Sequence, residues 1–300
     1  MEQASQQLTL AHCPTPRLDA ELLLAHVLGQ ERTWLYIYPE AELTAEQLAQ
    51  FEGLIARRAQ REPVAYLTGH KAFFGLDFLV TPAVLIPRPE TELLVEIALD
   101  WASSPISQSP SLPISQSPIS IADIGTGSGC IAVTLAQQLP QATLVAADLS
   151  AEALAIARQN AHRHRVQEAI TFGQSDLLQP WVGPFDLIVS NPPYVSDREY
   201  AATAPEVQQY EPRLALTAVD EGLALLERIL RQATTRLTPA GMLLMEIGST
   251  QGERGVALAQ RYFPQAKVSL QQDLAGLDRL LIVELGSIMS PTPAVNGPAD

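Results

Sequence analysis

The stretch IADIGTGSG, residues 121–129, decides the fold of this 300-residue chain. A short apolar run leads into three glycines spaced GxGxG, and a helical pattern follows over 129–138. Glycine allows a tight turn and a close approach of the backbone to a ligand, which suits a strand that ends at a binding site. The same composition also occurs in ordinary strand-to-helix turns, so the rest of the chain must separate the two interpretations.

Short apolar runs alternate with helical patterns on both sides of this stretch. The runs cover 119–125, 143–150, 169–174, 185–190, 241–248 and 278–285, and the helical patterns include 129–138, 151–162 and 222–237. This alternation predicts an α/β fold with a mostly parallel, doubly wound sheet and helices on both faces. Ligands of such sheets bind at the carboxyl ends of the strands.

The first eighty residues have a different pattern. An apolar helical face covers 18–28, and Thr44 with Gln47 forms a capping box at the start of a second helix. Aromatic and β-branched residues over 64–80 indicate a hairpin-like connector. The sequence therefore predicts a small N-terminal helical domain with a connector over 1–80, joined by a linking helix within 81–101 to a main domain over 120–285.

Two segments lack the composition of a packed core. Residues 102–119 contain seven Ser, four Pro and no charge, and the hexapeptide PISQSP occurs in them twice. We interpret this segment as a flexible insertion and 286–300 as a disordered tail.

Charge and cysteine content narrow the function classes. The net charge is −14, and residues 1–101 and 102–300 each carry −7, as 7 − 14 and 12 − 19. A protein that grips duplex nucleic acid by its phosphates usually has a basic surface, so we expect no direct nucleic-acid binding. Cys13 and Cys130 are too few for a disulfide framework or a zinc site, and no metal is predicted. No signal peptide or membrane-spanning run is visible, which makes a cytoplasmic location the expectation.

The strand ends supply a candidate nucleoside pocket. A dinucleotide fingerprint is GxGxxG, and GxGxG favours a nucleoside without a pyrophosphate, chiefly S-adenosylmethionine. Asp148, about twenty residues further on, could accept both hydroxyls of a ribose. Asp176 could accept an adenine amino hydrogen, with Leu149 and Leu177 over the ring faces. Asp148 and Asp176 could also be plain cap or turn residues, although Ser150 is better placed to cap the helix over 151–162.

The tetrapeptide Asn191-Pro192-Pro193-Tyr194 follows the strand at 185–190. Two prolines fix the loop and leave the Asn191 side-chain oxygen and the Pro192 carbonyl to accept hydrogen bonds from a planar NH2 group. Tyr194 adds a flat face and a hydroxyl. Holding both N–H bonds of an amide or exocyclic amine would aim its nitrogen at a sulfonium methyl. Elsewhere in a sequence this tetrapeptide would more simply end a strand.

At this point the chain resembles the protein-(glutamine-N5) methyltransferases that act on peptide chain release factors. Besides DIGTGSG and SNPPY, the matching segments are 61–78, 84–96 with IPRPETE, 208–216, EIGSTQ at 246–251 and 273–285. The resemblance implies a Rossmann-like S-adenosylmethionine-dependent methyltransferase domain, and as substrate the glutamine of the release factor's Gly-Gly-Gln loop.

The resemblance and the pocket reasoning together give the candidate site. Cofactor-binding residues are Gly125, Thr126, Gly127, Ser128, Gly129, Asp148, Asp176, Leu177 and Asn191. Substrate-binding residues are Asn191, Pro192, Pro193 and Tyr194, and of these Asn191, Pro192 and Tyr194 are the catalytic candidates. Arg88, Glu90 and Glu92 either border the site or are charges at a helix start.

Two other functions compete with this one. A nucleic-acid amino-methyltransferase would share NPPY, but the chain has only two lysines and no basic half. A nucleoside-binding adaptor would recognise release factors without catalysis, and the intact NPPY beside an intact glycine loop argues against it.

Overall fold

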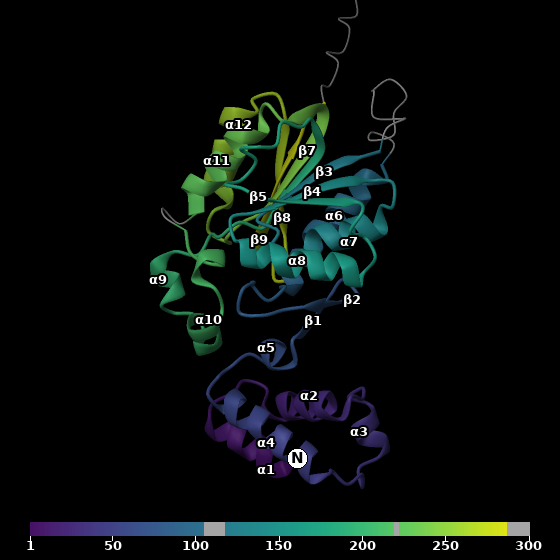
Figure 1. The fold of residues 1–300 in the computed structure, drawn as a ribbon. Coiled ribbons are helices and arrows are strands. Elements are labelled where there is room, and N and C mark those ends of the chain that lie inside the picture. The colour runs from purple at the N-terminus through teal and green to yellow at the C-terminus, as the bar shows by residue number, and fades with distance from the viewer. Residues whose placement is uncertain (105–117, 219–221, 287–300) are drawn as a thin grey trace, which may run out of the picture.

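A computed structural model describes residues 1–104, 118–218 and 222–286, and Figure 1 shows its fold. The predicted insertion at 102–119 and the predicted tail at 286–300 lie largely outside these ranges. The helices are α1 (Glu2–Leu10), α2 (Pro16–Leu28), α3 (Trp34–Ile37), α4 (Ala45–Ala59), α5 (Val64–Thr68), α6 (Glu92–Ala102), α7 (Cys130–Gln138), α8 (Ala151–Arg163), α9 (Asp197–Tyr200), α10 (Pro205–Tyr210), α11 (Leu223–Ala233) and α12 (Gly252–Tyr262), with 3-10 helices η1 (Pro89–Thr91) and η3 (Arg213–Ala215). The strands are β1 (His70–Phe73), β2 (Leu76–Leu79), β3 (Ser120–Ile124), β4 (Thr143–Asp148), β5 (Ile170–Gln174), β6 (Phe185–Ser190), β7 (Leu237–Glu246), β8 (Lys267–Gln272) and β9 (Asp278–Glu284).

The central sheet has seven strands in the order β5-β4-β3-β6-β7-β9-β8. Strands β3 to β7 are parallel, whereas β9 is antiparallel to β7 and β8. The predicted doubly wound, mostly parallel sheet is confirmed. The sequence patterns do not predict β8, because KVSLQQ mixes polar and apolar residues at the edge of the sheet. The chain leaves β3 toward β4 on one side and returns to β6 on the other, and ligands of such sheets bind at this reversal.

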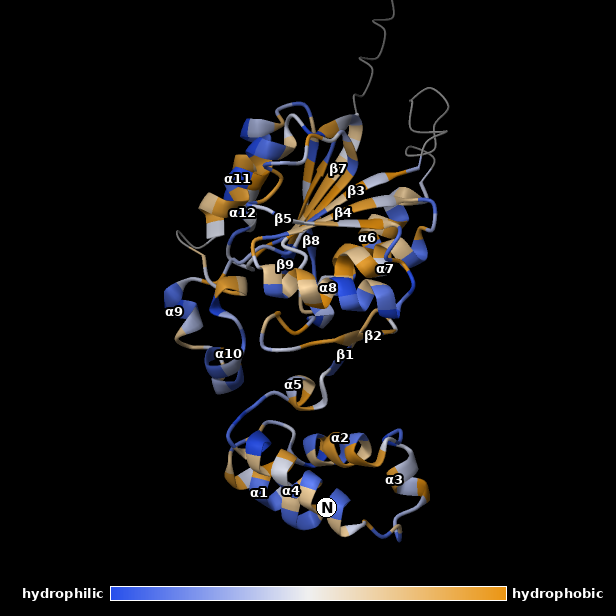
Figure 2. Ribbon diagram, in the orientation of Figure 1, coloured by the Kyte–Doolittle hydropathy of each residue, from blue (hydrophilic) through white to orange (hydrophobic). Residues whose placement is uncertain are grey.

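Helices cover both faces of the sheet, as the alternation of side chains along each strand requires. Ile121 packs in the core that contains residues of α6 and α7, and its neighbour Ala122 packs in the core that contains residues of α11 and α12. Figure 2 shows the central strands as the most uniformly apolar part of the fold. Their burial on both faces explains the continuous apolar runs in the sequence.

The N-terminal helices form a separate bundle with its own core, at the opposite end of the molecule from α11 and α12 (Figure 1). The predicted capping box at Thr44 and Gln47 is present, and α2 ends at Gly29 with a left-handed φ of 62°. The connector contains the short helix α5 and the β1–β2 hairpin. Phe73 and Phe78 of this hairpin belong to the core of the sheet, so the hairpin packs against the large domain.

Charged residues tie the helical bundle to the segment that contains α9 and α10. The Arg58 guanidinium is buried and donates to Asp19 at 2.8 Å and to Glu206 of α10 at 3.0 Å. The Tyr210 hydroxyl donates to the Gln60 carbonyl at 2.9 Å. A buried Arg with two carboxylate partners compensates the cost of desolvating its charge. The bundle therefore anchors the segment that continues into η3.

Candidate active site

The glycine loop joins β3 to α7 and uses its three glycines differently. Gly125 and Gly127 have φ of 72° and 55°, and a Cβ on Gly125 would meet no other residue within 4 Å. A Cβ on Gly129 would lie 3.1 Å from the Cβ of Ala157 in α8. Gly129 is therefore required for the close packing of the two helices, and it does not line the pocket described below.

Asp123, the last but one residue of β3, holds this loop from beneath. Its side chain is fully buried, and Oδ2 accepts from the Thr126 hydroxyl at 2.7 Å and from the Ala132 N–H at 3.2 Å. Burial raises the pKa of Asp123 to about 7. The carboxyl thus fixes both ends of the turn.

Asp148 ends β4 and faces the glycine loop. Its Oδ2 accepts from the Gly127 N–H and its Oδ1 from the Ser150 N–H, both at 2.8 Å. Burial raises the pKa of this carboxyl, and the two N–H donors oppose the rise. The predicted cap is Ser150, whose side chain accepts from the Ala153 N–H. Each Asp148 oxygen keeps a second acceptor position for a ligand hydroxyl.

Asp176 and Leu177 follow β5 on the next strand end. Asp176 Oδ2 accepts from the Arg228 guanidinium of α11 at 2.6 Å, a partner that the strand pattern does not predict. Leu177 has a positive φ of 58°, which is strained for a side chain of this size. Both residues line the pocket together with Arg228.

Asn191 follows β6 at the strand end beside β3. The preceding Ser190 donates to the Ile124 carbonyl at 2.8 Å, which fixes the two strand ends together. The Asn191 Nδ2 donates to the Thr91 hydroxyl at 3.0 Å. This bond uses the amino end of the amide and leaves Oδ1 as its acceptor end.

Behind Asn191 lies a buried chain of polar groups. The Thr91 hydroxyl donates to Glu246 Oε2 at 2.7 Å, and the Tyr194 hydroxyl donates to Glu246 Oε1 at 3.0 Å. Thr91 and Glu246 are each only 2% exposed. Burial raises the pKa values of both Glu246 and Tyr194. The Tyr194 hydroxyl is turned toward Glu246, and Tyr194 is not among the residues that line the pocket.

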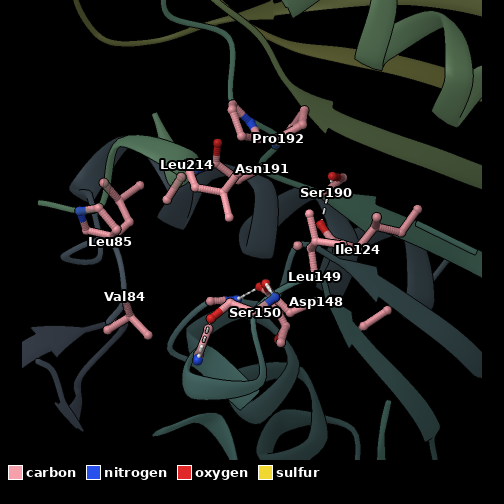
Figure 3. Close-up of a pocket in the computed structure, with 18 of the residues that line it drawn as sticks. Val84, Leu85, Ile124, Asp148, Leu149, Ser150, Ser190, Asn191, Pro192 and Leu214 are labelled. Carbon is pink, nitrogen blue, oxygen red and sulfur yellow. Dashed lines mark hydrogen bonds between the residues drawn. The ribbon is translucent and has the colours of Figure 1, made fainter. Parts of the chain in front are cut away.

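These strand ends enclose a pocket of about 590 Å³, the size range of small-molecule sites. Asp148, Leu149 and Ser150 lie on one side, Asn191, Pro192 and Leu214 on the opposite side, and Val84 and Leu85 at a third (Figure 3). Of the predicted site residues the structure brings together Gly125, Thr126, Gly127, Ser128, Asp148, Asp176, Leu177, Asn191, Pro192 and Pro193. The pocket suits a nucleoside, because there is open space beside Gly125, Asp148 offers hydrogen-bond acceptors and the walls are largely apolar.

Two parts of the site have no recognisable signature in the sequence. Thr91 lies within the IPRPETE segment and Glu246 starts EIGSTQ, but neither segment reveals that they contact Asn191 or Tyr194. The wall at 212–218 is also missed. Arg88 lines the pocket and donates to Glu211 at 2.7 Å. Glu92 instead accepts from the Phe74 N–H at 2.7 Å and so holds the β1–β2 turn, and Glu90 is exposed outside the pocket.

Solved structures of methyltransferases have a fold similar to that of this chain. The hMettl16 catalytic domain in complex with the MAT2A 3'UTR hairpin 1 matches with a TM-score of 0.55 at 15% identity, covering 82% of this chain and 85% of that one. A methyltransferase from Pyrococcus furiosus matches with a TM-score of 0.50 at 17% identity, covering 76% and 98%. Residues 111–210 also match the methyltransferase small domain, and this match, the fold and the pocket together define a Rossmann-like S-adenosylmethionine-dependent methyltransferase.

Comparison of the sequence defines the family. The chain matches the PrmC N-terminal domain over residues 1–69 and the methyltransferase small domain over 111–210. It is 42% identical to the release factor glutamine methyltransferase of Koribacter versatilis over 94% of this chain and 95% of that protein. The protein of the same name from Bordetella pertussis is 43% identical over 90% and 96%. The chain belongs to the release factor glutamine methyltransferase family.

Proposed function

We propose that this enzyme methylates the side-chain amide nitrogen, N5, of the glutamine in the Gly-Gly-Gln loop of a peptide chain release factor. The observation that carries the proposal is the placement of Asn191, with the acceptor end of its amide available, at the edge of a pocket formed by the glycine loop and Asp148. The names of the relatives at about 42% identity support the same substrate.

The residues of the pocket divide the work between the two ligands. S-adenosylmethionine, when bound, supplies an electrophilic methyl group on a sulfonium sulfur. Gly125 to Ser128 would approach it through the backbone, and Asp148 would accept from its ribose hydroxyls. Arg228 bonds Oδ2 of Asp176, so the other oxygen, Oδ1, would accept from the adenine amino group. Leu149 and Leu177 would cover the faces of the adenine ring.

Asn191 Oδ1 and the Pro192 carbonyl would hold the substrate amide. An amide nitrogen is a weak nucleophile, because its lone pair is delocalised into the carbonyl. Two acceptors on its two N–H bonds raise the electron density on nitrogen and fix its direction of approach. Methyl transfer would form the N–C bond as the S–C bond breaks, and the methylated nitrogen would then lose a proton to solvent. Pro193 keeps the loop rigid, and Tyr194 supports it from behind.

We further propose that the partner is protein alone, and that the enzyme works in the cytoplasm where release factors act. The net charge of −14 supports the absence of nucleic-acid binding. No helix in the described part of the chain has the length and apolar content that crossing a membrane needs.

Mass spectrometry of purified release factors tests the proposal. After incubation with enzyme and S-adenosylmethionine, the peptide with the Gly-Gly-Gln loop should gain the mass of one CH2 group, localised to the glutamine by fragmentation. A release factor with that glutamine replaced by Glu is the matched control and should gain nothing. Methyl incorporation into RNA or DNA, with none into release factors, would overturn the proposal in favour of a nucleic-acid methyltransferase.

A further inference from the structure

The chain of polar groups behind Asn191 gives each donor one defined acceptor. A hydroxyl carries a single hydrogen, and the Thr91 hydrogen points to Glu246 Oε2 at 2.7 Å. The Thr91 oxygen must then accept its remaining bond, which comes from Asn191 Nδ2 at 3.0 Å. A carboxylate at Glu246 therefore determines, through Thr91, which end of the Asn191 amide faces the pocket.

The elements that supply these groups are distant in sequence. Thr91 lies in η1, before the helix α6, and Glu246 is the last residue of β7, which pairs with β6. Tyr194 donates to the second oxygen of Glu246, so both carboxylate oxygens have a hydrogen-bond partner. Glu246 and Thr91 are nearly inaccessible to solvent, which leaves water little access to these bonds.

We propose that Glu246 and Thr91 are positioning residues that hold the Asn191 amide with Oδ1 toward the substrate nitrogen. The reverse orientation would present the Asn191 NH2 group to the substrate NH2 group, and two donors cannot bond each other. This inference rests on the proposed function, because it concerns how Asn191 is oriented to accept from the glutamine amide.

Thr91→Val tests the role of the hydroxyl, since it removes the hydroxyl and keeps a β-branched side chain of similar shape. We expect kcat for methyl transfer to a release factor to fall about ten- to a hundredfold, while the Kd for S-adenosylmethionine changes less than about threefold. Thr91→Ser restores a hydroxyl and should recover most of the lost turnover. Thr134→Val is the matched control: it removes another buried hydroxyl, which bonds the Cys130 carbonyl within α7, and should leave kcat unchanged.

Glu246→Gln tests the carboxylate independently. Thr91 and Tyr194 bond different oxygens of Glu246, and glutamine replaces one of these oxygens by an NH2 donor. One of the two hydroxyls must therefore reverse its bond. We expect a loss of kcat comparable to that of Thr91→Val, with the melting temperature measured for every variant. Wild-type kcat in both variants would overturn the proposal.

A double-mutant cycle separates this inference from the proposed function. If Thr91 acts through Asn191, then Thr91→Val should cost nothing further in the Asn191→Ala background. Additive losses would mean that Thr91 acts on the ligands or the fold directly, and the positioning role would be wrong. Wild-type turnover in Asn191→Ala alone would instead contradict the proposed function.

Discussion

The loop after β3 and the loop after β6 face the same pocket but are held in different ways. Residues 125–129 are fixed by hydrogen bonds that span at most 21 residues: Asp123 accepts from Thr126 and Ala132, and Gly127 donates to Asp148. The loop at 191–194 is fixed by side chains 52 and 100 residues away, through the Tyr194–Glu246 and Asn191–Thr91 bonds. The glycine turn is thus built within one region of the chain, whereas the orientation of the Asn191 amide, the catalytic candidate, depends on three separate parts of the chain.

Because the two loops are held differently, substitutions that weaken them should change different properties of the enzyme. Weakening the support of the glycine loop should change stability and cofactor affinity. Weakening the support of Asn191 should change turnover while the fold and cofactor affinity persist. Substitutions at four positions of the two loops and their supports test this division.

The largest expected effect is on the stability of the glycine loop and comes from Asp123. Its pKa rises from an ordinary 3.8 to about 7 because the carboxyl is buried. Between these values the folded protein binds more protons than the unfolded chain, so the free energy of unfolding should fall as pH rises, by up to about 4 kcal/mol from pH 4 to 8. Asp123→Asn should lack this component. Urea unfolding of both proteins across that pH range measures it, and parallel stability curves would contradict the burial of an ionisable carboxyl here.

The next effect is on turnover and comes from Asn191→Ala. Removing one pre-organised acceptor should lower the single-turnover rate about a hundredfold or more, near 3 kcal/mol. The Kd for S-adenosylmethionine and the melting temperature, measured separately, distinguish this loss of rate from a loss of cofactor binding or of folding. Asn191→Asp keeps an acceptor but cannot donate to Thr91, so its rate should lie between the two. A wild-type rate in the Ala variant would mean that Asn191 only ends a strand.

The same contrast explains how much of the molecule the sequence predicts. The six apolar runs and the glycine turn carry their pattern within short windows, and the sheet and the pocket at its strand ends follow from them. The sequence does not predict strand β8, because its position at the edge of the sheet exposes polar residues and breaks the apolar pattern. The roles of Thr91 and Glu246 cannot be predicted from the sequence, because a buried Thr or Glu has no local signature. Only the folded structure shows that they contact Asn191 and Tyr194. The motifs predict Tyr194 and Gly129 as site residues, but neither lines the pocket. The Tyr194 hydroxyl bonds Glu246, and the Cα of Gly129 packs against Ala157.

Asp148→Ala should lower cofactor affinity but not turnover, and so should separate the role of the glycine loop from that of Asn191. The loss of a carboxylate acceptor costs about 1.5–3 kcal/mol, or about ten- to a hundredfold in Kd. At saturating S-adenosylmethionine the single-turnover rate should recover to within a few fold of the wild type, which distinguishes this variant from Asn191→Ala. Calorimetric titration measures the affinity, and an unchanged Kd would make Asp148 a strand-end residue without contact to the ribose.

The smallest expected effect separates packing from ligand contact within the glycine loop. Gly129→Ala places a Cβ 3.1 Å from that of Ala157 in a residue with φ of 80°, so it should destabilise the fold by about 1–3 kcal/mol. Gly53→Ala is the control in α4, where a Cβ meets nothing within 4 Å, and it should stabilise that helix by about 0.5–1 kcal/mol. Thermal unfolding measures both changes. If Gly129→Ala loses cofactor affinity at unchanged stability, Gly129 contacts the ligand after all; if stability falls and the remaining folded enzyme binds normally, its role is to let α7 pack against α8.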